Sequence, residues 1–246
     1  VSDNGVNYTR IPIPDTAINS SNHLARYGAF PSKDVWYVTA GTFEGRAAPG
    51  AARNKLSRHF TVDDAAREIR VHAAATAAAS AVLAARAGLD TGPNDGDTAA
   101  IVKTSDGGKT WELVYQNKPG DNIYPNGIHC TSDQHCVACL EGDSARIVVT
   151  RDGGKTWKET MHDPDPHSSL MAVHMLSEKE VWVAGGHPAG QFEGRFWHSL
   201  DGGDTWTKTA FPGTYIISLD MQGPKSGFAV ALTSKQPAGL KLFKLQ

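Results

Sequence analysis

Three cysteines offer the first chemistry in this sequence. Cys130, Cys136 and Cys139 lie within ten residues of one another. The repeat pattern described below places Cys130 and Cys136 on neighbouring strands of one hairpin, which is close enough for a disulfide in an oxidising compartment. A reduced pair that behaves as small core hydrophobes is the alternative. A metal site that adds His129 and His135 is disfavoured, because Cys136 and Cys139 would point to opposite faces of a strand.

Histidines and carboxylates give a second set of groups that could bind a metal or transfer protons. Scattered histidines on loops are usually solvated, so the sequence predicts no metal site and no cofactor. The acidic pairs Asp163/Asp165 and Asp63/Asp64 have no surroundings that indicate acid–base catalysis. Neither a phosphate-binding loop nor a His-Glu-x-x-His motif is present. The histidines in question are His162, His167, His174, His187 and His198.

An eight-residue pattern, Ser/Thr-x-Asp-Gly-Gly-x-Thr-Trp, occurs three times and begins at Thr104, Thr150 and Ser199. Asp-Gly-Gly between two β-rich runs supplies the positive φ values of a tight turn between strands. The Asp carboxylate can accept hydrogen bonds from N–H groups of the turn, and the Trp ring can pack on the layer beneath. We therefore predict a structural role for Asp106, Gly108, Trp111, Asp152, Gly154, Trp157, Asp201, Gly203 and Trp206.

This pattern resembles the Asp-box, or BNR repeat, of sialidases, sortilin-type receptors and photosystem assembly factors. In those families the box lies at the turn between the third and fourth strands of a propeller blade. A second repeat, of two short strands around a polar turn, precedes each box at 29–38, 129–137 and 175–183, and recurs at 221–230. The box aspartates are 46 and 49 residues apart, which suits four strands per blade. We expect an all-β, single-domain propeller over 1–246, with about four four-stranded blades in a closed ring; a larger ring built from more than one chain also fits.

Residues 6–14 are predicted to close the ring as the outer strand of the last blade, whose other strands end with the alternating run 240–245. A sharper interpretation is that Arg10-Ile11-Pro12 resembles the Arg-Ile-Pro signature of sialidases, whose Arg holds the substrate carboxylate. Such an enzyme also needs two more arginines, a Tyr nucleophile paired with a Glu, and an Asp acid. Arg146, Arg151 and Arg195 lack the sequence surroundings expected of the two further arginines. The Tyr–Glu pair cannot be located in the sequence either.

The first blade contains an insertion of about fifty residues, 46–96, that is foreign to the repeat. Its middle predicts an Ala-rich helix over 62–87, with Thr61 as N-cap and Arg86 in the last turn. An Ala-rich helix face buries little area per residue but allows the helix backbone to approach a neighbouring surface closely. The insertion therefore either lies on its own propeller, docks a partner protein, or is disordered in isolation. Candidate docking residues on this helix are Thr61, Ile69, Ala77, Val82 and Arg86.

Composition narrows the classes of function. The chain has 246 residues and a formal net charge of −2, which argues against a general nucleic-acid binder. It has no apolar run of 18 residues, so no membrane-spanning helix is predicted. The chain begins with Val1 and not with Met, so we expect a processed or trimmed protein. Together with the cysteine pair, this favours the thylakoid lumen or another exported, oxidising compartment.

The run Val181–Gly186 followed by a box looks like the non-enzymatic propellers of the photosystem II stability and assembly factor family. This resemblance implies a lumenal protein that binds photosystem subunits, although the chain has fewer blades than that family and carries the insertion. We therefore expect a non-enzymatic accessory or assembly subunit of a large photosynthetic membrane complex, with protein partners and no nucleic acid. The alternative is a sialidase-like exo-glycosidase or an exported glycan-binding protein.

Overall fold

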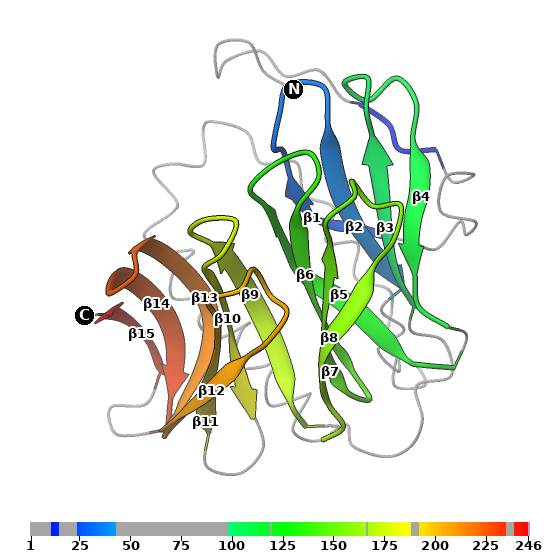
Figure 1. The fold of residues 1–246 in the computed structure, drawn as a ribbon. Coiled ribbons are helices and arrows are strands. Elements are labelled where there is room, and N and C mark those ends of the chain that lie inside the picture. Colours follow the sequence, from blue (N-terminus) through cyan, green and yellow to red (C-terminus); the bar gives the residue numbers. More distant parts are fainter. Residues whose placement is uncertain are drawn as a thin grey trace, which may run out of the picture.

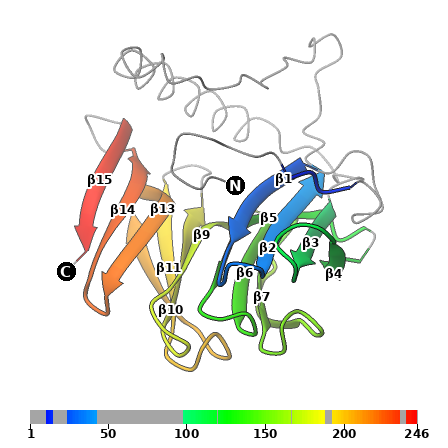
Figure 2. The same cartoon turned by 90° about the horizontal axis from the view of Figure 1, so that it is seen from above.

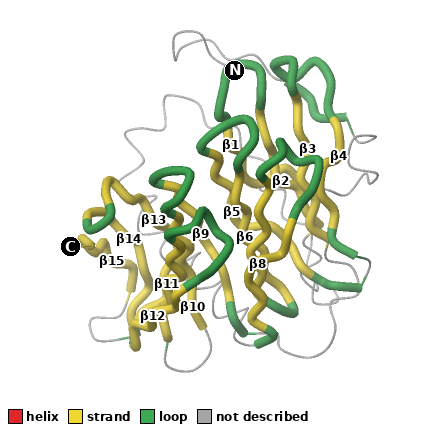
Figure 3. Tube along the Cα trace, in the orientation of Figure 1, coloured by secondary structure: helices red, strands yellow, loops and turns green. Residues whose placement is uncertain are grey.

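The structure is a computed structural model that describes residues 11–14, 24–42, 98–118, 120–165, 167–187, 192–234 and 239–245. These residues form strands and loops without a helix (Figure 3). Within those ranges, nothing has the helical length and hydropathy needed to cross a bilayer. The predicted helical insertion, 46–96, lies outside the described residues.

The strands form four antiparallel sheets, each of which is one blade. The first blade contains β1 (Leu24–Ala29), β2 (Trp36–Thr42), β3 (Thr98–Thr104) and β4 (Glu112–Gln116). The second contains β5 (Ile123–Cys130), β6 (Cys136–Gly142), β7 (Ala145–Thr150) and β8 (Lys158–Asp163). The third contains β9 (Ser169–Met175), β10 (Val181–His187), β11 (Glu193–Ser199) and β12 (Thr207–Pro212). The fourth contains β13 (Thr214–Gly223), β14 (Ser226–Thr233) and β15 (Gly239–Leu245).

The blades stand side by side in chain order (Figures 1 and 2), and the innermost strands β1, β5, β9 and β13 contact one another in that order. This is the blade arrangement of a β-propeller. The predicted hairpins are all present, and the fourth blade has the three C-terminal strands expected of it. The first and fourth blades lie at opposite ends of the row in Figure 1, so the described strands form an open row and not the predicted closed ring.

In the second and third blades, the inner strands are more buried than the outer strand. In β5 and β6 nearly every residue is buried, whereas β12 is exposed along its whole length. The second and third blades are covered on both faces by neighbouring blades, which accounts for the burial of their inner strands. Three apolar clusters fill the spaces between successive blades, and their largest members include Tyr37, Ile101, Leu140, Ile147, Leu170, Val183, Phe196 and Ile216.

The N-terminal segment does not occupy its predicted position as far as it is described. Residues 11–14 form no strand, and Ile13 packs on the first blade against the cluster of Ala40, Ala100 and Val102. Pro12 and Pro14 lack the N–H groups that a strand ladder would use, which accounts for the irregular backbone. Residues 6–10 lie outside the described residues.

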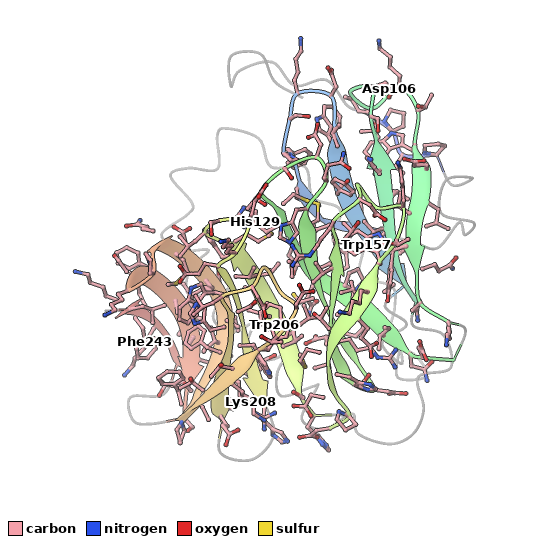
Figure 4. All side chains as sticks on the ribbon, viewed as in Figure 1. Asp106, His129, Trp157, Trp206, Lys208 and Phe243 are labelled. Carbon is pink, nitrogen blue, oxygen red and sulfur yellow. A yellow bond between two sulfur atoms is a disulfide. The ribbon has the colours of Figure 1, made fainter. Side chains whose placement is uncertain are left out.

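Two faces of the row differ in what they present. The turn face carries the first hairpin of each blade and the three repeated motifs; Asp106 marks it in Figure 4. The opposite face, here called the connection face, contains the links between blades, 117–122, 163–168 and 212–214, and the ends of β6 and β10.

Candidate functional site

Each repeated motif closes the turn between the third and fourth strands of its blade. In the second motif the backbone N–H of Thr156 donates to Asp152 Oδ1 at 2.9 Å, and the Thr156 hydroxyl donates to Asp152 Oδ2 at 2.6 Å. These two bonds, the hydroxyl's first, lower the pKa of Asp152 to about 2. Asp106 and Asp201 accept the same pair of bonds, and their pKa values are lowered too. The carboxylates hold the shape of the turn.

The second glycine of each motif lies where a blade meets its neighbour. Gly154 has a φ of +87°, and a Cβ placed on it would lie 3.2 Å from Val114 Cβ in the preceding blade. Gly203, with a φ of +97°, would place its Cβ 3.0 Å from Val149 Cγ2. At Gly108 the neighbour is Ile11 of the N-terminal segment. Both the conformation and the available space therefore require glycine there.

Two of the motif tryptophans, Trp157 and Trp206, also face the preceding blade. The Trp157 ring packs edge-on against Tyr115 at a centroid distance of 5.9 Å, and Trp206 Nε1 donates to Thr160 Oγ1 at 3.1 Å. Trp111 packs on the first blade's outer cluster beside the N-terminal segment. All three side chains are partly buried. Together with Gly154 and Gly203, Trp157 and Trp206 place the second and third motifs at the junctions with the preceding blades.

The predicted disulfide between Cys130 and Cys136 is present. The two residues face each other at the end of the β5–β6 hairpin, and both are buried in the cluster between the first and second blades. Cys139 is a free, buried thiol in the next cluster, and its burial raises its pKa. The two sides of β6 thus face different blades, as the expected strand geometry requires.

On the connection face, a chain of buried polar groups joins three blades. Tyr124 OH donates to Glu141 Oε1 at 2.7 Å, and Ser169 Oγ donates to the other oxygen of that carboxylate. Ser169 Oγ lies 2.7 Å from Tyr215 OH. Glu141 is 2% exposed. Because a buried carboxylate is costly unless it is hydrogen-bonded, this chain fixes the starts of β5, β9 and β13 relative to one another.

Tyr124 and Glu141 form a tyrosine–glutamate pair that sequence reasoning did not locate, because the two residues lie on paired strands at Tyr124↔Glu141 of the β5–β6 ladder. Arg26 lies over the Tyr124 ring, 5.0 Å from its centroid. The arginines considered from the sequence do not converge on this pair. Arg146 pairs with Asp121 and Glu159, and Arg195 with Glu193 and Asp163, on the connection face; Arg151 pairs with Asp204 on the turn face. Arg10 lies outside the described residues.

Histidines of the innermost strands form a short row across the blades. His129 of β5, marked in Figure 4, contacts His174 of β9 edge to face at 4.9 Å, and His174 Nδ1 lies 3.4 Å from Asp220 Oδ1 of β13. Burial lowers the pKa of both histidines, and the proximity of His174 lowers that of His129 further. Both rings are therefore neutral at pH 7.

The structure brings together Asp165, His167 and His187 on the connection face. His167 Nδ1 lies 3.4 Å from Asp165 Oδ1, and His187 Nε2 lies 3.5 Å from Asp165 Oδ2. All three residues were considered from the sequence, which predicted no metal site, because His187 is twenty residues from His167 and is brought beside it by the pairing of β9 with β10. The other two histidines, His162 and His198, lie outside this cluster.

The outward face of the fourth blade, on the side away from the third blade, carries exposed leucines. Ala229 and Ala231 of β14 point into the cluster between the third and fourth blades, so alternate positions point outward. The outward pairs include Val230↔Leu242, Leu232↔Leu240 and Phe228↔Lys244, and Leu232 itself is buried. Leu240 and Leu242 are 44% and 67% exposed. In the first three blades the corresponding face is covered by the next blade.

The residues named as a candidate docking helix, Thr61, Ile69, Ala77, Val82 and Arg86, lie outside the described residues. Their role stays a prediction. Of the functional residues, the sequence thus located the repeated motifs and the disulfide, while the buried polar chain, the Asp165 cluster and the exposed leucines of the fourth blade emerge only from the fold.

Comparison with known proteins gives one family model, sortilin/neurotensin receptor 3 (Sortilin-Vps10), which matches residues 99–219, slightly less than half of the chain. A search of curated proteins found no match. Residues 99–219 run from β3 into β13 and include all three repeated motifs.

Solved structures with similarity to the chain include YCF48 bound to a D1 peptide, with 15% identity and a TM-score of 0.48 over 87% of this chain and 49% of that one. The GH74 xyloglucanase of Xanthomonas campestris has 14% identity and a TM-score of 0.41, over 62% and 27% of the two chains. The GH74 enzyme of Niastella koreensis has 13% identity and a TM-score of 0.35, over 60% and 26%. The chain thus spans about half the length of the YCF48 chain and about a quarter of each GH74 chain. These proteins are β-propellers.

Proposed function

We propose that the chain is a non-enzymatic propeller that binds protein, as an accessory or assembly subunit of a large membrane complex. Its repeated motif and the run Val181–Gly186 resemble photosystem II stability and assembly factors, so the complex we propose is a photosystem and the partners are its subunits. The disulfide supports a thylakoid lumen or another exported, oxidising compartment.

The outward face of the fourth blade is the observation that carries this proposal. Leu240 and Leu242 are exposed at positions that a following blade would cover, and large apolar side chains exposed together favour a protein interaction site. β15 is also an edge strand, because the fourth blade has three described strands where the others have four. A free edge beside exposed leucines suits a partner that adds a strand or packs a flat apolar surface there.

Native size in extract of the source tests the proposal. The wild-type chain is expected to migrate with a large pigmented complex on a density gradient, and Leu242→Lys should release it as a free species near 26.3 kDa. Leu200→Lys is the matched control, because Leu200 is 69% exposed but lies in the third repeated turn. Wild-type chain that migrates free refutes the subunit role.

Binding and light-scattering experiments on the purified protein distinguish a partner subunit from a second copy of the chain on this face. A synthetic D1 peptide, with which YCF48 was solved, is the first isolated probe. Binding to the wild type and to Leu200→Lys but not to Leu242→Lys supports a partner subunit on this face. If light scattering instead gives a dimer of the wild type and a monomer of Leu242→Lys, a second copy of the chain covers the face and the partner assignment is wrong.

The tyrosine–glutamate pair favours a glycosidase as the second candidate. Tyr124 OH and Glu141 Oε1 are 2.7 Å apart, as a Tyr nucleophile and its activating base would be. Both side chains are buried, at 5% and 2% exposed, so a substrate reaches them only after the connection face opens. Turnover of a fluorogenic sialoside that is lost in Tyr124→Phe would establish this activity, and no turnover by the wild type would reject it.

A further inference from the structure

We propose that Asp165, His167 and His187 bind a divalent transition metal ion of the Zn²⁺ class on the connection face. The proposal is independent of the proposed function. Its ligands come from two elements: Asp165 and His167 from the link between β8 and β9, and His187 from the end of β10.

The separations suit a tetrahedral ion. One ligand atom from each residue lies within 4.8 Å of the other two, and the two histidine–carboxylate distances are 3.4 and 3.5 Å. Zn²⁺ bonds of about 2.0–2.1 Å at tetrahedral angles place neighbouring ligand atoms about 3.3 Å apart. Only small side-chain rotations are therefore needed to enclose the ion. The two imidazole rings are already 5.2 Å apart.

The backbone holds these ligands in place. The N–H of His167 donates to Asp165 Oδ1 at 3.0 Å, and the N–H of Ser168 donates to the Asp165 carbonyl at 2.9 Å. On the other side, Gly186 pairs with Ser169 in the β9–β10 ladder, which brings the next residue, His187, beside the link. A site whose ligands are fixed before binding loses less conformational entropy when the ion arrives.

Charge at the site also suits a cation. Asp163, two residues before Asp165, is engaged by Arg195 Nη1 at 3.4 Å, whereas within the described ranges the ion-pair partners of Asp165 are the two histidines. Two imidazoles and one carboxylate are ligands that Zn²⁺ favours, and three protein ligands leave a position for water or an external group.

Calorimetric titration of the chelator-treated full chain with ZnCl₂ alone tests this site. We expect one ion per chain, with His187→Asn and Asp165→Asn each weakening the affinity at least tenfold. His162→Asn is the matched control, because its ring lies on β8 beside Glu159 and outside the cluster. Titration with Co²⁺ gives a second readout, since its visible absorption reports coordination and should be lost in His167→Asn.

Circular dichroism of each variant separates lost ligands from lost fold. A variant that melts like the wild type and no longer binds Zn²⁺ supports the site. The chain has ten histidines, so Zn²⁺ can also bind elsewhere. Unchanged affinity in both His187→Asn and Asp165→Asn would overturn the proposal, as would a wild-type chain that binds no Zn²⁺ below about 1 mM, an affinity of roughly 4 kcal/mol.

Discussion

Replacing Gly154 with Ala should lower the free energy of unfolding for two reasons: the positive φ of the turn and the close contact with the preceding blade. Gly154 has a φ of +87°, and an L-residue in that region costs about 1–2 kcal/mol. The new methyl would also lie 3.2 Å from Val114 Cβ and 3.4 Å from both of its methyl carbons. Val is stiff at χ1, so this crowding should add about 1–3 kcal/mol, typical of overpacking. The free energy of unfolding should therefore fall by about 2–5 kcal/mol.

Gly120 provides the control within the same chain. Its φ is +85°, but a Cβ built there meets nothing within 4 Å. Gly120→Ala should therefore cost only the conformational part, about 1–2 kcal/mol. Both variants are measured by urea unfolding followed by Trp fluorescence, with stability taken from the midpoint and the slope.

A third variant identifies the crowded neighbour. In the Gly154→Ala background, Val114→Ala removes the methyl groups that the new Cβ meets, so the pair should be more stable than the sum of the single changes predicts, by about 1–2 kcal/mol. If Gly154→Ala and Gly120→Ala cost the same within about 0.5 kcal/mol, the motif does not hold neighbouring blades together and the reasoning fails.

Two further predictions concern the disulfide and the motif carboxylate. Cys130 and Cys136 are six residues apart, so replacing both with Ala should lower the free energy of unfolding by about 2 kcal/mol from loop entropy; a reductant should then have no further effect, and an unchanged urea midpoint would contradict this. Asp152 has a pKa of about 2 against about 3.9 in an unfolded chain, so its contribution to stability is present above about pH 4 and is lost as pH falls through about 2. Thr156→Val removes the largest cause of that shift, so NMR titration should find the Asp152 pKa moved up toward 3.9; a value still near 2 would show that the hydroxyl bond is not responsible.

The sequence predicts the strands well where turn chemistry is explicit. Asp152-Gly153-Gly154 marks a turn because only glycine tolerates the positive φ there, and the same reasoning located all three third-to-fourth strand turns. Spacing of these turns then gave the number of strands per blade. The disulfide followed from the same register, since Cys130 and Cys136 sit opposite each other once the hairpin is placed.

Features that depend on contacts between blades could not be predicted from the sequence. The run Ile11-Pro12-Ile13-Pro14 alternates like a strand, yet Ile13 covers the side of the first blade, a position that no local pattern specifies. His187 joins Asp165 only because the β9–β10 register places it there. A ring cannot be told from an open row by counting repeats, because closure depends on the angle between neighbouring blades.

The contacts between successive blades repeat along the row, and this has a mechanical consequence. Each described blade touches mainly the blade before it and the blade after it, so the molecule behaves as a one-dimensional array whose cohesion is a sum over junctions. A pull applied along such an array detaches units in sequence from an end, and an inner unit is released only after an outer neighbour has gone. The disulfide lies in the second of the described units, so it reinforces an interior position of the array.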